Sequence, residues 1–142
     1  MLGTALGTDR LQGVELFAPC ARRELRVVER LATVLDVAAG RRLCTKGEIG
    51  RECFVVLAGV ADVLDDDGGV VASVGVGEPI GEMAVLAASP TRTATVVAST
   101  PMTVLVFSRR DLTSLLDAAP CVGFRLLRIM TTRLLGGRTD SS

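Results

Sequence analysis

The sequence predicts a mainly β domain with α-helices at both ends, and three observations support this fold class. Before residue 36 the apolar residues recur at helical spacing. From Val37 to Phe107 short β-branched runs alternate with turn residues, and after Ser108 the helical spacing returns. A chain of 142 residues is long enough for one domain with a real hydrophobic core.

The first predicted element is a helix over residues 22–35. Its apolar residues are spaced for one face, and its charged residues fall largely on the others. The residues that define the apolar face are Leu25, Val28, Leu31 and Leu35. We therefore expect an amphipathic helix that packs against the β domain.

Five strands are predicted next, at residues 55–57, 60–64, 70–74, 93–97 and 103–107. Residues 65–69, with the sequence Asp-Asp-Asp-Gly-Gly, form a predicted hairpin tip. This acidic run lacks the spaced oxygen ligands and the closing glutamate of a calcium loop. We interpret it as a solvated turn without a ligand.

Two helices are predicted at the C-terminal end. Ser108 followed by Asp111 is typical of a helix N-cap, and Leu112, Leu115 and Leu116 would form the apolar side. Pro120 then begins a second helix that stops at Gly136-Gly137. The apolar surface of this last helix exceeds one packing stripe. Its arginines are expected in solvent or against a partner's acids: Arg125, Arg128, Arg133 and Arg138.

Charge and hydropathy exclude several classes of protein. Lys+Arg and Asp+Glu both number 16, so the formal net charge is +0 and offers no general attraction to nucleic acid. Apolar runs are interrupted before they reach the about 18 residues of a membrane span, and no secretory signal is evident. We expect a soluble protein without a direct nucleic-acid partner.

Cysteine and histidine usage argues against a metal centre. The four cysteines are scattered without a C-x-x-C pair, and histidine is absent. We expect all four to be small buried hydrophobes in a reducing compartment, which favours a cytoplasmic protein. No G-x-S-x-G elbow or triphosphate-binding loop is present. The sequence predicts a binding module without metal or cofactor, not an enzyme.

The most informative segment is residues 79–96, which holds Gly81, Glu82 and Arg92. Gly81 permits close approach of a ligand, and a short helix over 82–86 would direct unpaired N–H groups at an anion. The Arg92 guanidinium suits a phosphate bidentately. Glu82 would repel a phosphate, so a neutral donor such as a ribose hydroxyl is its natural partner. The pattern predicts a site for a nucleotide with a buried, singly charged phosphate.

This segment resembles the phosphate-binding cassette of the cyclic nucleotide-binding domain family. Residues 46–50 (Lys-Gly-Glu-Ile-Gly) and 53–60 resemble the turn and strand pair that precede the cassette, and Leu16-Phe17 resembles the usual entry. The similarity covers about residues 14–135, which leaves 1–13 as an N-terminal extension and 136–142 as a flexible tail. It implies a double-stranded β-helix, a jelly-roll-like β-roll, closed by flanking N- and C-terminal helices.

The resemblance also implies a role for each site residue. Backbone N–H groups of Gly81, Met83 and Ala84 would bind the cyclic phosphate. Glu82 would accept the ribose 2′-hydroxyl, and Arg92 would bind the exocyclic oxygens. Thr93 would add a hydroxyl or backbone contact. Glu48, in the preceding turn, is expected to brace the loop instead of touching ligand.

The base has few aromatic partners in this chain, which lacks tryptophan and tyrosine. Ile80 stands where the family often has an aromatic residue. Cover for the base would come from Phe124, Leu127 or Met130 on the last helix. We expect cAMP as the ligand, on the family-level argument that this is a bacterial-style domain, whereas Thr93 would also be compatible with the amino group of cGMP.

The expected mechanism is a ligand-linked shift in the arrangement of the cassette and the last helix, which acts as a lid or pairs with a second subunit in a homodimer. Familiar bacterial relatives carry a helix-turn-helix after this helix, but only six residues follow Gly136 here. The expected partner is therefore an unknown effector protein or a fused effector domain. The alternative is a structural or protein-interaction module with a degenerate or repurposed pocket.

Overall fold

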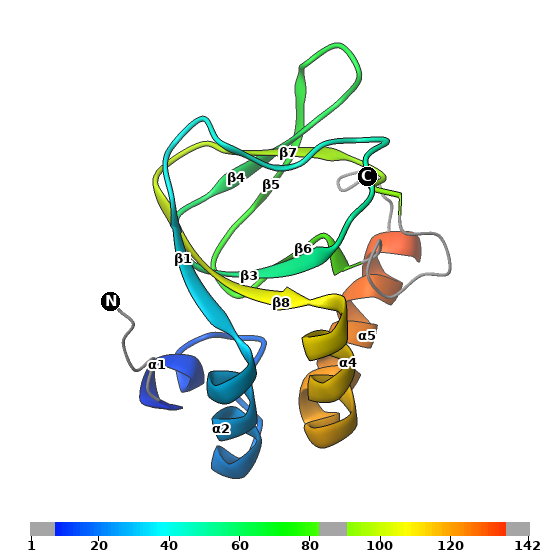
Figure 1. The fold of residues 1–142 in the computed structure, drawn as a ribbon. Helices are drawn as coiled ribbons and strands as arrows, with labels where there is room; N and C mark the ends of the chain where they lie inside the picture. Colours follow the sequence, from blue (N-terminus) through cyan, green and yellow to red (C-terminus); the bar gives the residue numbers. More distant parts are fainter. Residues whose placement is uncertain (1–7, 83–90, 136–142) are drawn as a thin grey trace.

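The computed structural model describes residues 8–82 and 91–135. Within these residues, two helices come first, eight strands follow, and two further helices end the described chain (Figure 1). The helices are α1 (Thr8–Gln12), α2 (Arg22–Leu31), α4 (Arg109–Ala118) and α5 (Pro120–Leu135). The strands are β1 (Thr33–Val37), β2 (Arg42–Cys44), β3 (Glu52–Ala58), β4 (Ala61–Leu64), β5 (Val70–Val74), β6 (Pro79–Ile80), β7 (Thr95–Ala98) and β8 (Met102–Ser108).

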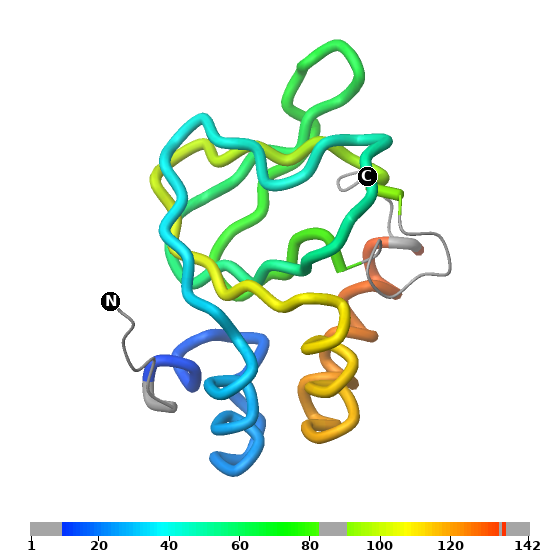
Figure 2. The backbone as a smooth tube through the Cα atoms, viewed as in Figure 1, coloured from blue at the N-terminus to red at the C-terminus, as the bar shows by residue number. Residues whose placement is uncertain are grey.

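The strands form two four-stranded antiparallel sheets. One sheet has the order β1-β8-β3-β6 and the other the order β2-β7-β4-β5. The chain crosses repeatedly between the sheets and so winds into a roll, with the helices gathered below it (Figure 2). The predicted fold class, a mainly β roll flanked by N- and C-terminal helices, is confirmed.

Strands β3 and β8 separate two hydrophobic cores. Alternate side chains of a strand point to opposite faces, and in β3 Cys53, Val55 and Leu57 belong to one core whereas Phe54 and Val56 belong to the other. The nearly continuous apolar run of β3 follows from this arrangement, because both of its faces are covered.

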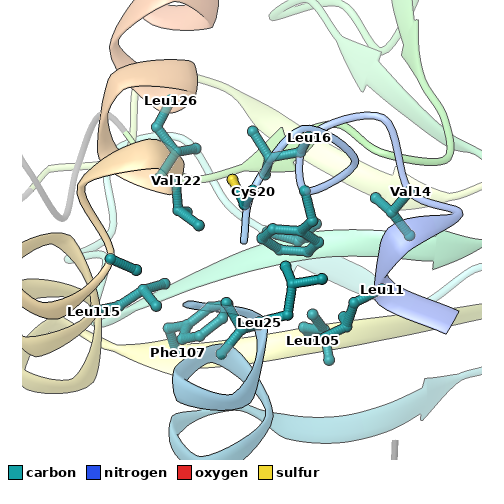
Figure 3. Packing of buried hydrophobic residues seen from close by; sticks show 14 of the residues in the cluster. Leu11, Val14, Leu16, Cys20, Leu25, Leu105, Phe107, Leu115, Val122 and Leu126 are labelled. Atoms are coloured by element: carbon teal, nitrogen blue, oxygen red, sulfur yellow. The ribbon is translucent and has the colours of Figure 1, made fainter. Parts of the chain in front are cut away.

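The core beneath the roll joins the N-terminal segment to the C-terminal helices (Figure 3). Leu11 of α1 and Leu25 of α2 are buried there together with Val122 and Leu126 of α5. The two ends of the chain are therefore parts of one packed unit, although about one hundred residues separate them in the sequence.

The first helix is shorter than predicted. We expected a helix over 22–35, but α2 ends at Leu31 and residues 33–37 form β1, which pairs with β8. Leu35 continues the helical spacing by coincidence, and the β-branched Thr33 and Val34 favour the strand once β8 offers a partner.

The predicted N-cap at Ser108 and the predicted turn at residues 65–69 are both present in the structure. The backbone N–H of Asp111 donates to the Ser108 hydroxyl at 3.0 Å, which confirms the N-cap of α4. The Asp65 carboxylate accepts hydrogen bonds from the backbone N–H groups of Asp67 and Gly69 in the β4–β5 hairpin. In the described part of the chain, no helix is both long and apolar enough to cross a membrane.

Candidate functional site

Arg92 is a buried cation held by backbone oxygens. The residue is 7% exposed. Nη1 donates to the Gly81 carbonyl at 3.1 Å, and Nη2 donates to the Glu52 carbonyl at 2.8 Å. Its backbone N–H donates to the Glu48 carbonyl at 2.7 Å, so the turn around Glu48 is hydrogen-bonded to the backbone of Arg92.

The charge of Arg92 has no acidic partner in the described part of the chain. Lys46 forms an ion pair with Asp66, and Arg133 forms one with Glu82. Within residues 8–82 and 91–135, neither pair includes Arg92. The two carbonyls that Arg92 contacts are dipoles without net charge. Removing an ion from water without a compensating charge costs on the order of several kcal/mol. The site therefore presents a buried positive charge that favours an anion.

Gly81 lies directly against this guanidinium. Its φ of +82° falls in the left-handed region, where residues with a side chain are strained. A Cβ at this position would collide with Arg92 Nη1 and would lie 3.2 Å from the Glu52 carbonyl oxygen. Glycine is thus required here both by the backbone conformation and by the space that Arg92 occupies.

Glu82 is the buried acid of the site, with 2% of its side chain exposed. Arg133 of α5 donates from Nη1 to Glu82 Oε2 at 2.7 Å. The C-terminal end of α5 therefore touches the predicted ribose-binding residue directly. A carboxylate has about four lone-pair positions, so Glu82 can accept a hydroxyl while it keeps Arg133.

Two reduced cysteines, Cys44 and Cys53, lie close enough to feel these charges. Burial raises the pKa of Cys44 to about 11, while Arg92 lowers it and Glu82 raises it by smaller amounts. Burial also raises the pKa of Cys53, again with Glu82 adding to the effect. Both are therefore thiols at neutral pH and poor nucleophiles.

The structure brings together Gly81, Glu82 and Arg92 from the predicted set. Met83 and Ala84 lie outside the described residues, as do most of the predicted 82–86 helix and the 136–142 tail. Thr93 is exposed beside Arg92. On α5, Phe124 and Leu127 are largely exposed and Met130 is half-buried. Met130 is one turn from Arg133, so it is the candidate base cover nearest to the contact with Glu82.

The role of the α5 arginines differs from the sequence prediction. We expected Arg133 and Arg125 in solvent or against a partner, but Arg133 binds Glu82 and Arg125 donates to the carbonyls of Leu16 and Glu15. No local signal distinguishes these arginines from the exposed Arg128. Their partners lie 51 and about 110 residues away in the sequence.

The prediction that all four cysteines are reduced was wrong for two of them. Cys20, between α1 and α2, forms a disulfide with Cys121 in the first turn of α5, with their Cα atoms 5.6 Å apart. The sequence separation of 101 residues carries no pairing signal. Folding brings both residues into the core beneath the roll.

Comparisons with known proteins identify the family of the chain. A family model described as the cyclic nucleotide-binding domain matches residues 34–119. A Pycsar effector protein of Pseudomonas aeruginosa is 33% identical over 109 residues, 77% of this chain and 35% of the relative. The human cyclic nucleotide-gated channel beta-1 is 33% identical over 127 residues, 86% of this chain and 10% of the channel. The chain thus spans about a third or less of these relatives.

Solved structures give the same result. A cyclic nucleotide-binding domain from Methylobacillus flagellatus superposes with a TM-score of 0.73 at 29% identity, covering 89% of this chain and 75% of that one. The N-terminal domain of a Streptomyces coelicolor transcriptional regulator gives a TM-score of 0.67 at 28% identity, covering 94% and 100%. By the extent of the family match, this chain belongs to the cyclic nucleotide-binding domain family.

Proposed function

We propose that this domain is a sensor that binds a cyclic nucleotide, with cAMP as the preferred ligand, and signals through α5. The observation that carries the proposal is the buried Arg92 guanidinium, which lies against Gly81 and has only neutral acceptors within the described residues. A cyclic phosphate carries one negative charge and would supply the missing countercharge.

Each side chain then has a distinct task in binding. Arg92 keeps two N–H groups on the carbonyls of Gly81 and Glu52, which fix the plane of the guanidinium. A guanidinium has five N–H donors, so the remaining ones are suited to the exocyclic phosphate oxygens. Gly81 has no side chain and lets its backbone approach the phosphate. Glu82 would accept the ribose 2′-hydroxyl.

The wider function is regulatory binding instead of catalysis. The family is defined by cyclic nucleotide binding, and its relatives here include an effector protein and gated channels. We propose that an effector, separate or fused, reads the position of α5, as would a second copy paired through α5 in a homodimer. A cytoplasmic location fits these tasks, because a sensor of this kind must meet intracellular nucleotides.

Between the two cyclic nucleotides, we propose that the domain prefers cAMP to cGMP. A structure described as a cAMP-bound PfPKA-R superposes on this chain with a TM-score of 0.74 at 24% identity. That likeness shows a shared fold. Thr93 is exposed, and its hydroxyl oxygen is suited to accept a hydrogen bond from the guanine amino group of cGMP. We therefore expect cAMP to bind more tightly than cGMP, but we do not expect cGMP to be excluded.

Direct calorimetric titration tests the proposal. We expect saturable binding of cAMP, weaker binding of cGMP, and much weaker binding of 5′-AMP, whose phosphate carries more charge and is not constrained by the ring. If neither cAMP nor cGMP gives binding heat, and neither competes with a bound fluorescent cyclic nucleotide, the sensor proposal fails. The alternative, a structural or protein-interaction module, would then be favoured. Equal binding of 5′-AMP and cAMP would contradict recognition of the cyclic phosphate.

A further inference from the structure

The α5 helix is attached to the rest of the domain at both of its ends. In its first turns, Cys121 is bonded to Cys20, the Cys121 N–H donates to Glu24 Oε1 at 3.2 Å, and Arg125 Nε donates to the Leu16 carbonyl at 2.9 Å. In its last turn, Arg133 contacts Glu82. About 18 Å of helix separates Cys121 from Arg133, at 1.5 Å per residue.

The disulfide is the only covalent link among these attachments, and Cys121 lies two residues after the junction of α4 and α5. Ala119 is the single residue between α4 and α5, and its backbone departs from helical geometry. A helix that swings about this point moves least at Cys121 and most at Arg133. A bond at Cys121 therefore fixes the first turn of α5, and small movements of that turn are amplified at Arg133.

Noncovalent contacts also hold the interface around the disulfide together. Leu16, Phe17, Val122 and Leu126 are all at most 2% exposed in the core around the bond, and Cys20 lies among them (Figure 3). The hydrogen bonds of Glu24 and Arg125 cross the same interface. With this packing in place, opening the bond removes a restraint but leaves the core closed. Cys121 is also partly exposed, whereas Cys20 is buried, so a small thiol would approach the bond from the side of Cys121.

We propose that Cys20 and Cys121 form a reversible dithiol–disulfide site that controls the mobility of α5 and, if the domain binds nucleotide as proposed above, the rate at which nucleotide leaves. The disulfide holds α5 with Arg133 on Glu82. Reduction widens the movement of α5 and weakens this contact.

The redox partner belongs to the class of low-molecular-weight disulfides. The Cys121 thiolate attacks one sulfur of oxidised glutathione and expels one glutathione thiolate. The Cys20 thiolate then attacks the Cys121 sulfur of the mixed disulfide and releases the second glutathione. The cysteine pair gives up two electrons and two protons in total, the glutathione disulfide accepts the electrons, and an excess of free thiol reverses both steps.

The test compares the full chain after equilibration with oxidised glutathione and with dithiothreitol. Alkylation under denaturing conditions followed by mass spectrometry counts free thiols, with two expected after oxidation and four after reduction. Hydrogen exchange then measures the amides of residues 121–135. Stopped-flow release of a fluorescent cyclic nucleotide measures dissociation, which we expect to be about fivefold or more faster in the reduced protein.

Variants separate the proposed site from general thiol effects. Cys20→Ala with Cys121→Ala should behave as the reduced protein under both conditions. Cys44→Ala is the matched control, since Cys44 is buried and its raised pKa of about 11 keeps it a thiol. It should keep the redox response. If the double variant unfolds, the comparison of the two redox forms of the unmodified chain still decides the question.

Two results would overturn the proposal. Four free thiols after oxidation would show that the pair does not form. If the pair does form on oxidation, but hydrogen exchange over α5 is the same in the oxidised and reduced proteins, the disulfide is a structural bond that does not control the mobility of α5. If neither form binds nucleotide but exchange over α5 differs, the proposed function fails while control of α5 stands.

Discussion

At the scale of single residues, the site is defined by a cation and an acid that are both removed from solvent. Arg92 contacts two carbonyls and Glu82 contacts Arg133. The acid therefore has its countercharge within the protein, whereas the cation has none among the described residues. This asymmetry is what favours an anionic ligand that also carries neutral hydroxyl donors.

Replacing Arg92 by lysine tests the geometry of the cation. Arg92→Lys keeps the charge but loses the planar fork, so it cannot hold two carbonyls and two phosphate oxygens together. We expect the Kd for cAMP to rise about 10- to 100-fold, or about 1.4–2.8 kcal/mol. Calorimetry measures this, with the exposed Arg128→Lys as the matched control. Unchanged affinity in a folded Arg92→Lys protein would remove Arg92 from the phosphate site.

The pair of Glu82 and Arg133 is tested by a double-mutant cycle. Arg133→Gln leaves the carboxylate of Glu82 buried without this partner, which should lower the free energy of unfolding by about 1–3 kcal/mol, less than a fully buried pair because Arg133 is 22% exposed. Adding Glu82→Gln should restore part of the loss, with a coupling of about 0.5–3 kcal/mol. Urea unfolding of the four proteins measures it. Strictly additive effects would show that the contact has no energetic weight.

At the scale of elements, the sequence predicts those features whose causes are local. Five strands and the Ser108 cap followed from runs and turns of a few residues. The strands β2 and β6 were not predicted, because they have only three and two residues and are too short to show an alternating pattern. They are defined by their pairing with β7 and β3. Likewise Gly81, Glu82 and Arg92 fall within one short segment, whereas Arg133 reaches the site only through the tertiary fold.

The two halves of α5 have different roles, and truncation separates them. Val122 and Leu126 are core residues, whereas Arg133 contacts the site. A chain ending at Met130 should stay folded and release cyclic nucleotide about fivefold or more faster. A chain ending at Ala119 should lose several kcal/mol of stability, since removing one buried leucine side chain alone costs about 2–5 kcal/mol. Thermal unfolding and stopped-flow release measure the two effects.

Equal release rates from the full chain and from the chain ending at Met130 would contradict a lid role for the end of α5. The ligand preference should survive in both, because Gly81, Glu82 and Arg92 are retained. If the chain ending at Ala119 were as stable as the full chain, the packing assigned to the first half of α5 would be wrong.

At the scale of the whole molecule, the site is linked to the C-terminal helices along a continuous path. Arg92 binds the carbonyl of Glu52 at the start of β3, and Glu52 pairs in register with Ser108, which caps α4. Helix α4 leads to α5, whose Arg133 returns to Glu82 beside Gly81. The start of α4 and the end of α5 are therefore both connected, through these contacts, to the residues that hold Arg92 and Glu82.

Because the ligand would bind across this path, it should stabilise the domain as a unit. At a hundredfold excess over Kd, a ligand adds about 2.7 kcal/mol to the free energy of unfolding, which for a domain of this size raises Tm by about 5–10 °C. Differential scanning fluorimetry with cAMP, cGMP, 5′-AMP and ATP measures the shift, which we expect for the cyclic nucleotides alone. The Arg92→Lys protein should need a correspondingly higher cAMP concentration for the same shift. A shift that is identical in this variant would mean that the stabilising ligand binds somewhere other than beside Gly81 and Glu82.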